Sequence, residues 1–422
     1  MAIMQSEVER ALNGLRDLAS PAAMQDLAAR GMQVARQKVN SHLHLPPNFS
    51  AFRDVQQAVD LAAEQGVRVL GASNYYDYEV YGDFARLAKG QGVFPLFGLE
   101  VICMVDELAA SGVKINDPGN PGKFYLCGKG ITKFATMSPE AQRLLGIIRR
   151  NDSARMAKII AKLTEIFEQH DVRTGLNEAA VIDAVVKRHD CPRRCVWLQE
   201  RHVCQAFQER FFELVPAGRR IETLSRILGA APGTGPQDPV GVQNEIRTHL
   251  LKAGKPAYVE ETFIGFEDAY RLVAELGGIP CYPTLADGAR PICPFEDPVD
   301  GLIDRIQRRG IGFAEFIPLR NAPDVLSTYV KTMRAAGLVI TAGTEHNTLD
   351  LPPIEPMCVG GRPIPEDVKE IFWEGTCVVA AHQFLTLHGQ RGFEAGSGQD
   401  RIEWLARLGA AVIRQYQEGN KQ

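Results

Sequence analysis

Short β-prone runs alternate with amphipathic helical segments along much of this 422-residue chain. The alternation occupies residues 36–137, stops, and resumes over residues 254–350. Apolar runs at 67–72 and 93–101, for example, flank a helical segment at about 81–90. Because strand–helix–strand alternation is typical of parallel βα units, the pattern predicts an α/β fold whose parallel strands close, or nearly close, into a barrel.

Three other parts of the chain have apolar positions at helical spacing and no convincing strands. Residues 138–253 predict an all-α insertion in the barrel. Residues 1–35 predict an N-terminal helical extension, and residues 351–422 predict a C-terminal helical region. The barrel itself is therefore expected to consist of the two separated stretches on either side of the insertion.

Charge, apolar stretches and cysteine number exclude several classes of protein. The net charge is -4 without a sustained basic run, so we expect neither a nucleic acid polymer nor a membrane surface as a partner. No apolar stretch is long enough to span a bilayer, and the first residues lack a secretory signal pattern. The nine cysteines are scattered and odd in number, unlike a disulfide framework. We expect a cytoplasmic protein, and its oligomeric state stays open.

His42 and His44 end the first predicted strand in the pattern H-x-H. Side chains two residues apart on a strand point to the same face, so both imidazoles face one way. At the mouth of a βα barrel such a pair is a common start to a metal site. Two histidines at a strand end can also be structural, so the residues that follow the later strands decide between these interpretations.

Polar residues follow several later strands and would gather at the same end of the barrel. Those that are good ligands for a first-row metal are Glu100, Glu345 and His346. Imidazole together with carboxylate suits zinc, manganese or iron. A bound ion of this kind lowers the pKa of its water and neutralises charge on a phosphoryl oxygen, which is a usual route to hydrolysis.

Several motifs carry a resemblance to a known family. Besides the H-x-H pair, Gly98-Leu99-Glu100 forms a Gly-x-Glu strand. Gly254-Lys255-Pro256-Ala257-Tyr258-Val259 and Gly277-Gly278-Ile279 follow the insertion. Their order resembles the PHP (polymerase and histidinol phosphatase) superfamily. The chain is most similar to its nucleotide and nucleoside-phosphate phosphoesterases with a helical insertion, which contain the Gly-Lys-Pro-Ala-Tyr-Val stretch. The resemblance covers roughly residues 36–350.

This resemblance implies a PHP-like distorted (β/α)7 barrel and a metal-dependent phosphoesterase. Such an enzyme would hydrolyse a small phosphorylated metabolite through a metal-bound hydroxide. The resemblance implies that one divalent ion, zinc, manganese or iron, is bound by His42, His44 and Glu100. Glu345 or His346 would complete the metal shell.

Substrate-contacting roles are also implied. Lys255 occupies the position of a lysine that holds the substrate phosphate, and His202 that of a histidine on the inserted helices. Asn74 is expected to contact substrate from the loop after the second strand. Tyr75 and Tyr282 are expected to act as acid/base or hydrogen-bonding groups.

The chain departs from the family pattern at several ligand positions. Asn74-Tyr75 stands where the family has an Asp-His step, Tyr125 where it has a histidine, and Tyr282 where it has the histidine of Ala-His-Pro. The closing Ser-Asp-x-His reads Thr344-Glu345-His346-Asn347. A three-metal cluster cannot be built from what remains, so the metal site is partly degenerate.

Four interpretations therefore stay open. The chain is a mononuclear metal hydrolase or lyase, or a degenerate, non-catalytic protein whose pocket binds a ligand without metal. A third possibility is new chemistry based on Tyr75, Tyr76 and Tyr282. The fourth is an amidohydrolase-type metal hydrolase, which also opens with H-x-H but needs an Asp on the last strand, where this chain has Glu345. The phosphoesterase is the preferred hypothesis.

Overall fold

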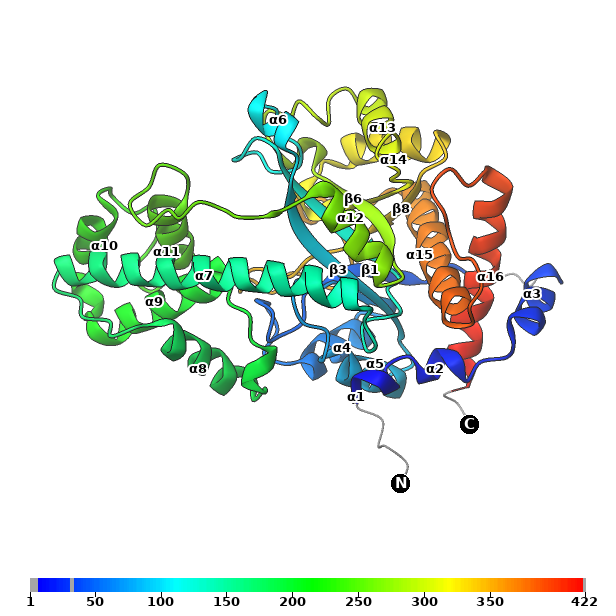
Figure 1. The fold of residues 1–422 in the computed structure, drawn as a ribbon, viewed down its shortest axis with the longest axis horizontal. Coiled ribbons are helices and arrows are strands. Elements are labelled where there is room, and N and C mark those ends of the chain that lie inside the picture. Colours follow the sequence, from blue (N-terminus) through cyan, green and yellow to red (C-terminus); the bar gives the residue numbers. More distant parts are fainter. Residues whose placement is uncertain (1–6, 31–33, 420–422) are drawn as a thin grey trace.

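A nearly closed, barrel-shaped sheet forms the centre of the molecule (Figure 1). The computed structural model describes residues 7–30 and 34–419. The sheet follows the path β1-β2-β3-β4-β6-β7-β8, with β5 paired to β3. The strands are β1 (Lys38–Leu43), β2 (Val67–Ala72), β3 (Phe94–Met104), β4 (Lys123–Lys129), β5 (Ile264–Gly265), β6 (Ile279–Thr284), β7 (Phe313–Phe316) and β8 (Val339–Ala342). A parallel bridge between Leu43 and Glu345 joins the end of β1 to the segment after β8. The expected distorted α/β barrel is confirmed.

Strand β4 runs against both of its neighbours. It is antiparallel to β3 and to β6, whereas β1–β2, β2–β3, β6–β7 and β7–β8 are parallel pairs. The connection from β3 to β4 returns to its starting point, and a hydrogen bond from the Val105 N–H to the Gly122 carbonyl oxygen at 2.8 Å holds its two ends together. Its helix α6 (Asp106–Ala110) is too short to cross the barrel, as a parallel return requires. The expectation of uniformly parallel strands is therefore wrong for β4.

The helices between strands cover the outside of the barrel, because each has one apolar face. Helix α4 (Val55–Glu64) begins after Asp54, whose Oδ1 accepts from the Gln57 N–H at 2.8 Å. This bond satisfies one of the free N–H groups of the first turn. The corresponding helices after later strands are α5 (Tyr81–Gly90), α12 (Phe266–Glu275), α13 (Val299–Gln307) and α14 (Pro323–Ala335).

The inserted segment is a helical lobe beside the barrel (Figure 1). Its helices are α7 (Pro139–Gln169), α8 (Glu178–His189), α9 (Glu200–Leu214), α10 (Arg220–Leu228) and α11 (Pro239–Ile246). Phe167, Phe207 and Phe211 belong to an apolar core that is separate from the barrel core. Helix α7 buries Leu144 in the barrel core and Leu163 in the lobe core, so one continuous helix joins the two.

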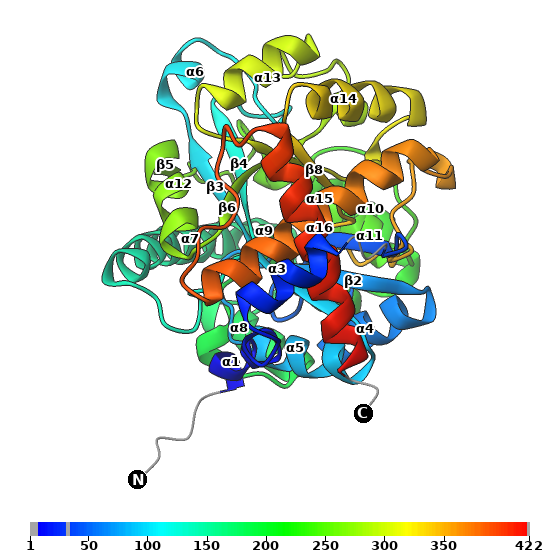
Figure 2. The same ribbon diagram turned by 90° about the vertical axis from the view of Figure 1, so that its right-hand side faces the viewer.

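Helices α15 (Glu366–Leu387) and α16 (Gln399–Glu418) pack against one another on the side of the barrel away from the lobe (Figure 2). They approach so closely that a Cβ on Gly409 would lie 1.7 Å from the Cys377 carbonyl oxygen. Helix α3 (Pro21–Ala29) packs on α16. The other N-terminal helices are α1 (Glu7–Arg10) and α2 (Asn13–Arg16).

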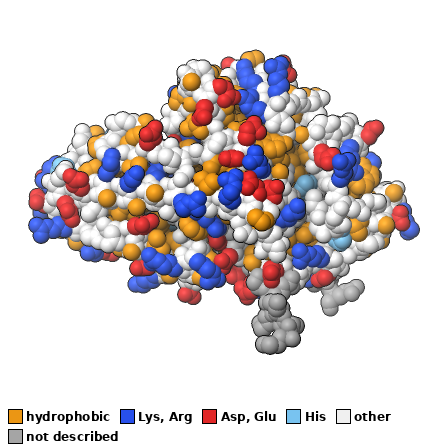
Figure 3. All heavy atoms as spheres, in the orientation of Figure 1, with side chains coloured by type: hydrophobic (Ala, Val, Ile, Leu, Met, Phe, Trp, Pro, Cys, Tyr) orange, Lys and Arg blue, Asp and Glu red, His pale blue; other side chains and the backbone are white. Residues whose placement is uncertain are grey.

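The surface shows no preference for one sign of charge on the face in view, where acidic and basic side chains are interspersed (Figure 3). This distribution agrees with the small net charge of -4. Within the described part of the chain, none of the helices combines the length and the apolar character that crossing a membrane requires.

The buried His382 should make the stability of the folded protein sensitive to acid. Its Nε2 lies 2.9 Å from the Gly277 carbonyl oxygen and its Nδ1 accepts from the Phe393 N–H at 3.1 Å, so the ring is held neutral. Burial lowers the pKa of His382 to about 4. Between this pKa and the ordinary value of 6.5, the unfolded state binds a proton on His382 and the folded state does not. The stability that the neutral ring contributes is therefore present above pH 6.5 and is lost as pH falls from 6.5 toward 4. Between pH 7 and 5, wild-type protein should lose about 2 kcal/mol more stability than His382→Gln, measured by urea unfolding. Equal losses in the two proteins would contradict this assignment.

Candidate metal centre

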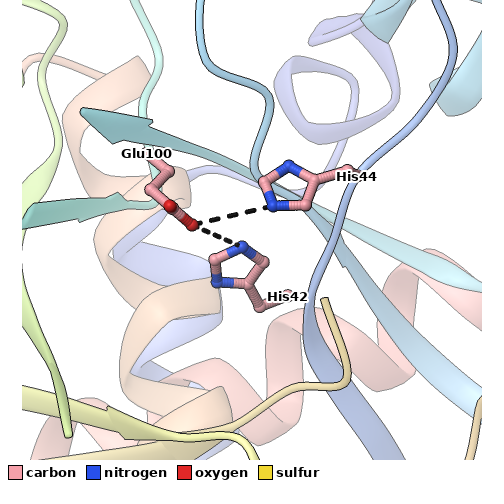
Figure 4. Close-up of side chains that lie close together, drawn as sticks. All are labelled: His42, His44 and Glu100. Carbon is pink, nitrogen blue, oxygen red and sulfur yellow. Dashed lines mark ion pairs between the residues drawn. The ribbon is translucent and has the colours of Figure 1, made fainter. Parts of the chain in front are cut away.

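His42, His44 and Glu100 come together inside the carboxyl end of the barrel (Figure 4). His42 lies near the end of β1, His44 directly follows that strand, and Glu100 lies in β3. The Glu100 Oε2 atom is 3.3 Å from His42 Nε2 and 3.7 Å from His44 Nε2. All three side chains are buried, with exposed fractions of 4% or less. The H-x-H pair and the Gly-x-Glu strand, far apart in the sequence, thus supply one cluster.

The donor atoms of this cluster fit a metal ion. His42 Nε2 and both ring nitrogens of His44 are buried, and none has a hydrogen-bond partner among the described residues. Buried polar atoms are nearly always satisfied, so three such nitrogens next to one carboxylate need an explanation. Imidazole nitrogens and a carboxylate are the ligands that zinc, manganese and iron accept. Residues His42, His44 and Glu100 could therefore hold a divalent ion.

Glu315 orients the His42 ring from the opposite side. Its Oε1 lies 2.6 Å from His42 Nδ1, while its Oε2 accepts from Ser41 Oγ at 2.9 Å and from Lys129 Nζ at 2.5 Å. The Nδ1 proton is donated to Glu315, and Nε2 faces Glu100, where it can bind a metal ion once its own proton has left. A carboxylate behind a histidine ligand fixes the tautomer and raises the basicity of the ligand in metal sites.

Close packing of β8 against β1 fixes the position of His42. A Cβ on Gly343, the residue after β8, would lie 2.3 Å from the His42 Cβ. The chain then enters the left-handed region at Glu345 (φ 58°) and His346 (φ 53°), a conformation uncommon for residues other than glycine. Glycine at 343 is therefore required by contact, and Glu345 and His346 carry the backbone strain at the barrel mouth.

The two histidines have opposite charge preferences. Burial opposes the charged form of His42, but the carboxylates of Glu315 and Glu100 outweigh it and raise the pKa of His42 to about 9. Burial lowers the pKa of His44 to about 4, against the attraction of Glu100. The pKa of Glu100 lies below its usual value, because contacts with His42 and His44 outweigh burial. At neutral pH, metal binding must displace a proton from His42, so affinity should rise with pH.

Tyr75 closes the cluster on the cavity side. Its hydroxyl donates to Glu100 Oε1, and its ring stacks on His44 with 5.1 Å between ring centroids. Burial and the neighbouring charge of Glu100 raise the pKa of Tyr75 well above 10. The hydroxyl therefore keeps its proton and acts as a donor, as expected of a hydrogen-bonding group.

A cavity of about 670 Å³ lies between the barrel mouth and the helical lobe and includes Glu100 and Tyr75 in its lining. Most cations on its wall are paired with carboxylates: Lys123 with Glu261, Arg155 and Arg247 with Glu200, and Arg320 with Glu345. Two are different. Among the described residues, neither Arg201 nor Lys252 has a carboxylate partner within ion-pair distance.

The two predicted ligands after β8 lie in different surroundings. Glu345 lines the cavity, but its carboxylate accepts from Arg320 and Asn347. His346 turns away into the protein, where its Nδ1 is 2.7 Å from Thr344 Oγ1 and its Nε2 is 2.9 Å from the Pro352 carbonyl oxygen. Both nitrogens of His346 are thus engaged, and the Glu345 carboxylate is paired with Arg320, so neither predicted ligand joins the cluster of His42, His44 and Glu100 in this structure.

Three other predicted site residues have structural positions. Asn74 is buried and exchanges two hydrogen bonds with the Leu45 backbone, at 2.8 and 3.0 Å. His202 is buried, with its Nδ1 bonded to the Gln199 N–H and its Nε2 near the Pro47 carbonyl. Tyr282 is fully buried and its hydroxyl donates to Glu296 at 2.8 Å. These contacts leave no polar atom of the three directed at a ligand.

Lys255 differs in being exposed on the turn after the lobe, where its N–H donates to the Lys252 carbonyl at 2.9 Å. Lys252, three residues earlier, is the lysine that lines the cavity. The sequence motif thus lies next to the cavity, but Lys252 and not Lys255 has its side chain in the cavity lining. Sequence reasoning also missed Glu315, which lies behind His42. Glu315 on β7 could have been found, since a carboxylate within an otherwise apolar predicted strand signals a buried charge.

The chain matches no protein-family model and no curated protein. Among solved structures, a proposed metal-dependent phosphoesterase from Bifidobacterium adolescentis aligns with a TM-score of 0.51 and 13% identity, over 80% of this chain and 96% of that one. An amidohydrolase from Chromobacterium violaceum, with bound sulfate and no metal, aligns with a TM-score of 0.48 and 18% identity, over 79% of this chain and 96% of that one. At this identity the first similarity shows a shared fold alone, and the second is too weak to support an argument.

Proposed function

We propose that the chain is a metal-dependent phosphoesterase of the PHP type, acting on a small phosphorylated metabolite. One observation carries the proposal: three unsatisfied buried imidazole nitrogens lie beside Glu100, and Glu100 lines a cavity whose wall bears the unpaired cations Arg201 and Lys252. A divalent ion held by His42, His44 and Glu100 would supply an acidified water and neutralise charge on a phosphoryl oxygen.

The residues of the wall supply the binding chemistry. Arg201 is half-buried, and burial together with the nearby charge of Arg247 lowers its pKa. A guanidinium in this position gains from an anionic partner, because no carboxylate of the described residues forms an ion pair with it to offset its loss of water. Phosphate suits the planar N–H groups of arginine, and Lys252 adds a second positive charge. Tyr75 keeps its proton and holds Glu100 in place.

A second candidate is a pocket that binds a phosphorylated ligand without cleaving it. One observation favours it: the Glu345 carboxylate is engaged by Arg320 and Asn347, which leaves three protein ligands in place for a metal. The same wall of cations would then serve binding alone. Turnover distinguishes the two functions.

The proposal predicts a specific effect of Arg201→Ala. Loss of a charge-assisted contact of about 1.5–3 kcal/mol should lower kcat/KM for a phosphomonoester roughly 10- to 150-fold, mainly through KM. The assay follows phosphate release from a panel of sugar and nucleoside phosphates with Zn²⁺, Mn²⁺ or Fe²⁺ added, beside a panel of N-acyl amino acids. Arg143→Ala, which removes an exposed arginine on α7, is the matched control and should retain full activity.

Other outcomes have clear meanings. Hydrolysis of the N-acyl amino acids alone would replace the phosphoesterase by an amide hydrolase. Tight binding of phosphorylated compounds without turnover, at every metal tested, would favour the binding pocket. Equal KM values for Arg201→Ala and wild type would remove Arg201 from the phosphate site.

A further inference from the structure

A second group of potential metal ligands lies deeper in the barrel, behind His42. His42 Nδ1, Cys127 Sγ and a Glu315 carboxylate oxygen all lie within 4.8 Å of one another. Cys127 Sγ is 4.0 Å from His42 Nδ1, and Glu315 Oε1 is 2.6 Å from it. This inner cluster uses the opposite ring nitrogen of His42 from the one that faces Glu100. Imidazole, thiolate and carboxylate are together a ligand set for zinc or a similar ion.

A positive charge already belongs to this inner cluster. Lys129 is 2% exposed, and its Nζ donates to Glu315 Oε2 and to the Ser41 carbonyl oxygen at 3.3 Å. Lys129 and Cys127 are two residues apart on β4, so both side chains point to the same face of that strand. A buried lysine is rare unless it is paired, and here the ammonium donates to two oxygen atoms, one of the Glu315 carboxylate and one of the Ser41 carbonyl.

We propose that the Lys129 ammonium occupies an inner metal site formed by His42 Nδ1, Cys127 and Glu315, in place of a metal ion. The protein is thereby restricted to one metal ion, at the outer cluster of His42 Nε2, His44 and Glu100. Only the outer ion in this statement depends on the proposed function. The inner site is defined by its own residues. Lys129 is thus a residue that determines metal number and position, and among the described residues its ion pair is with Glu315 and not with the outer ligand Glu100.

The physical reason is charge balance in a buried volume. Glu315 is fully buried, and a buried carboxylate must be neutralised by a partner. The Lys129 ammonium does this with a single charge, without requiring Cys127 to lose its proton. A divalent ion in the same place would need Cys127 as a thiolate, and with an outer ion on Nε2 the His42 ring would bridge the two ions as an imidazolate, with the displaced protons released to solvent. Removal of the ammonium should therefore expose a site that selects a thiolate-binding metal.

The test compares cobalt binding by wild type, Lys129→Met and Lys129→Met/Cys127→Ser. Cobalt content is measured by elemental analysis, and a thiolate-to-cobalt charge-transfer absorption reports ligation by cysteine. We expect about one equivalent and no thiolate absorption in wild type, and about two equivalents with the absorption in Lys129→Met. The second equivalent and the absorption should both disappear in the double variant. Lys133→Met, which removes an exposed lysine from the same segment, is the matched control and should behave as wild type.

Each outcome decides the proposal. A thiolate absorption in cobalt-loaded wild type, or a folded Lys129→Met that binds no more cobalt than wild type, would overturn it. If Lys129→Met does not fold, the wild-type spectrum still discriminates, because an ion in the inner site must contact Cys127. If wild type binds no metal but Lys129→Met binds about one thiolate-dependent equivalent, the inner site stands and the proposed function fails.

Discussion

The double variant His42→Ala/His44→Ala should bind no divalent metal, whereas wild type retains about one equivalent of zinc, manganese or iron. The substitutions remove all three unsatisfied imidazole nitrogens and leave Glu100 as the one acidic ligand of the outer cluster. Loss of an outer-shell partner alone lowers metal affinity roughly 10- to 100-fold, so loss of two direct ligands should exceed this. The measurement is elemental analysis of protein purified without a histidine tag.

The control for this experiment is a second histidine pair outside the cluster. His170 follows α7, and His249 is half-buried beside Glu245 on the lobe, 3.1 Å from its carboxylate. His170→Ala/His249→Ala should leave the metal content unchanged. Wild-type protein that is folded, contains no metal and takes up none when Zn²⁺, Mn²⁺ or Fe²⁺ is added would refute the metal centre and leave a binding pocket.

Glu315→Gln should lower the free energy of unfolding by about 3–5 kcal/mol. The carboxylate is fully buried and is the partner of both Lys129 and His42. These contacts, the Lys129 charge foremost, outweigh the burial that opposes the charged form and hold the pKa of Glu315 at about 2. Glutamine has a similar shape without the charge, so the variant leaves the Lys129 ammonium buried without a counter-charge. Urea unfolding at neutral pH measures the loss.

Two variants sharpen this prediction. Glu366→Gln removes a carboxylate that is 69% exposed and pairs with Arg36 on the surface, where the expected loss is below about 1 kcal/mol. Glu315→Gln/Lys129→Met removes both buried charges and should recover part of the stability, since a neutral pair is less costly than an isolated charge. A Glu315→Gln protein within about 1 kcal/mol of wild type would show that the network is not a stabilising element.

Features that depend on neighbouring residues could be predicted from the sequence, whereas features that depend on contacts between distant residues could not. The alternation of strands and helices, and the placement of His42 and His44 at the end of β1, follow from local periodicity. Hydrophobic faces recur at intervals that the sequence displays directly, so the barrel and the helical lobe were accessible from the sequence. The direction of β4 could not be predicted from the sequence, because it depends on the tertiary path of the β3–β4 connection.

The sequence by itself determined which residue types end the strands, and therefore that imidazole and carboxylate meet at the barrel mouth. Only the tertiary structure decided which polar side chains face the cavity. His202 and Asn74 turn to backbone partners, and Lys252 takes the place expected of Lys255. The direction of a polar side chain is set by the hydrogen-bond partners around it, and those partners come from distant parts of the chain. For the same reason the pairing of Lys129 with Glu315, 186 residues apart, emerges only when β4 and β7 lie in one barrel.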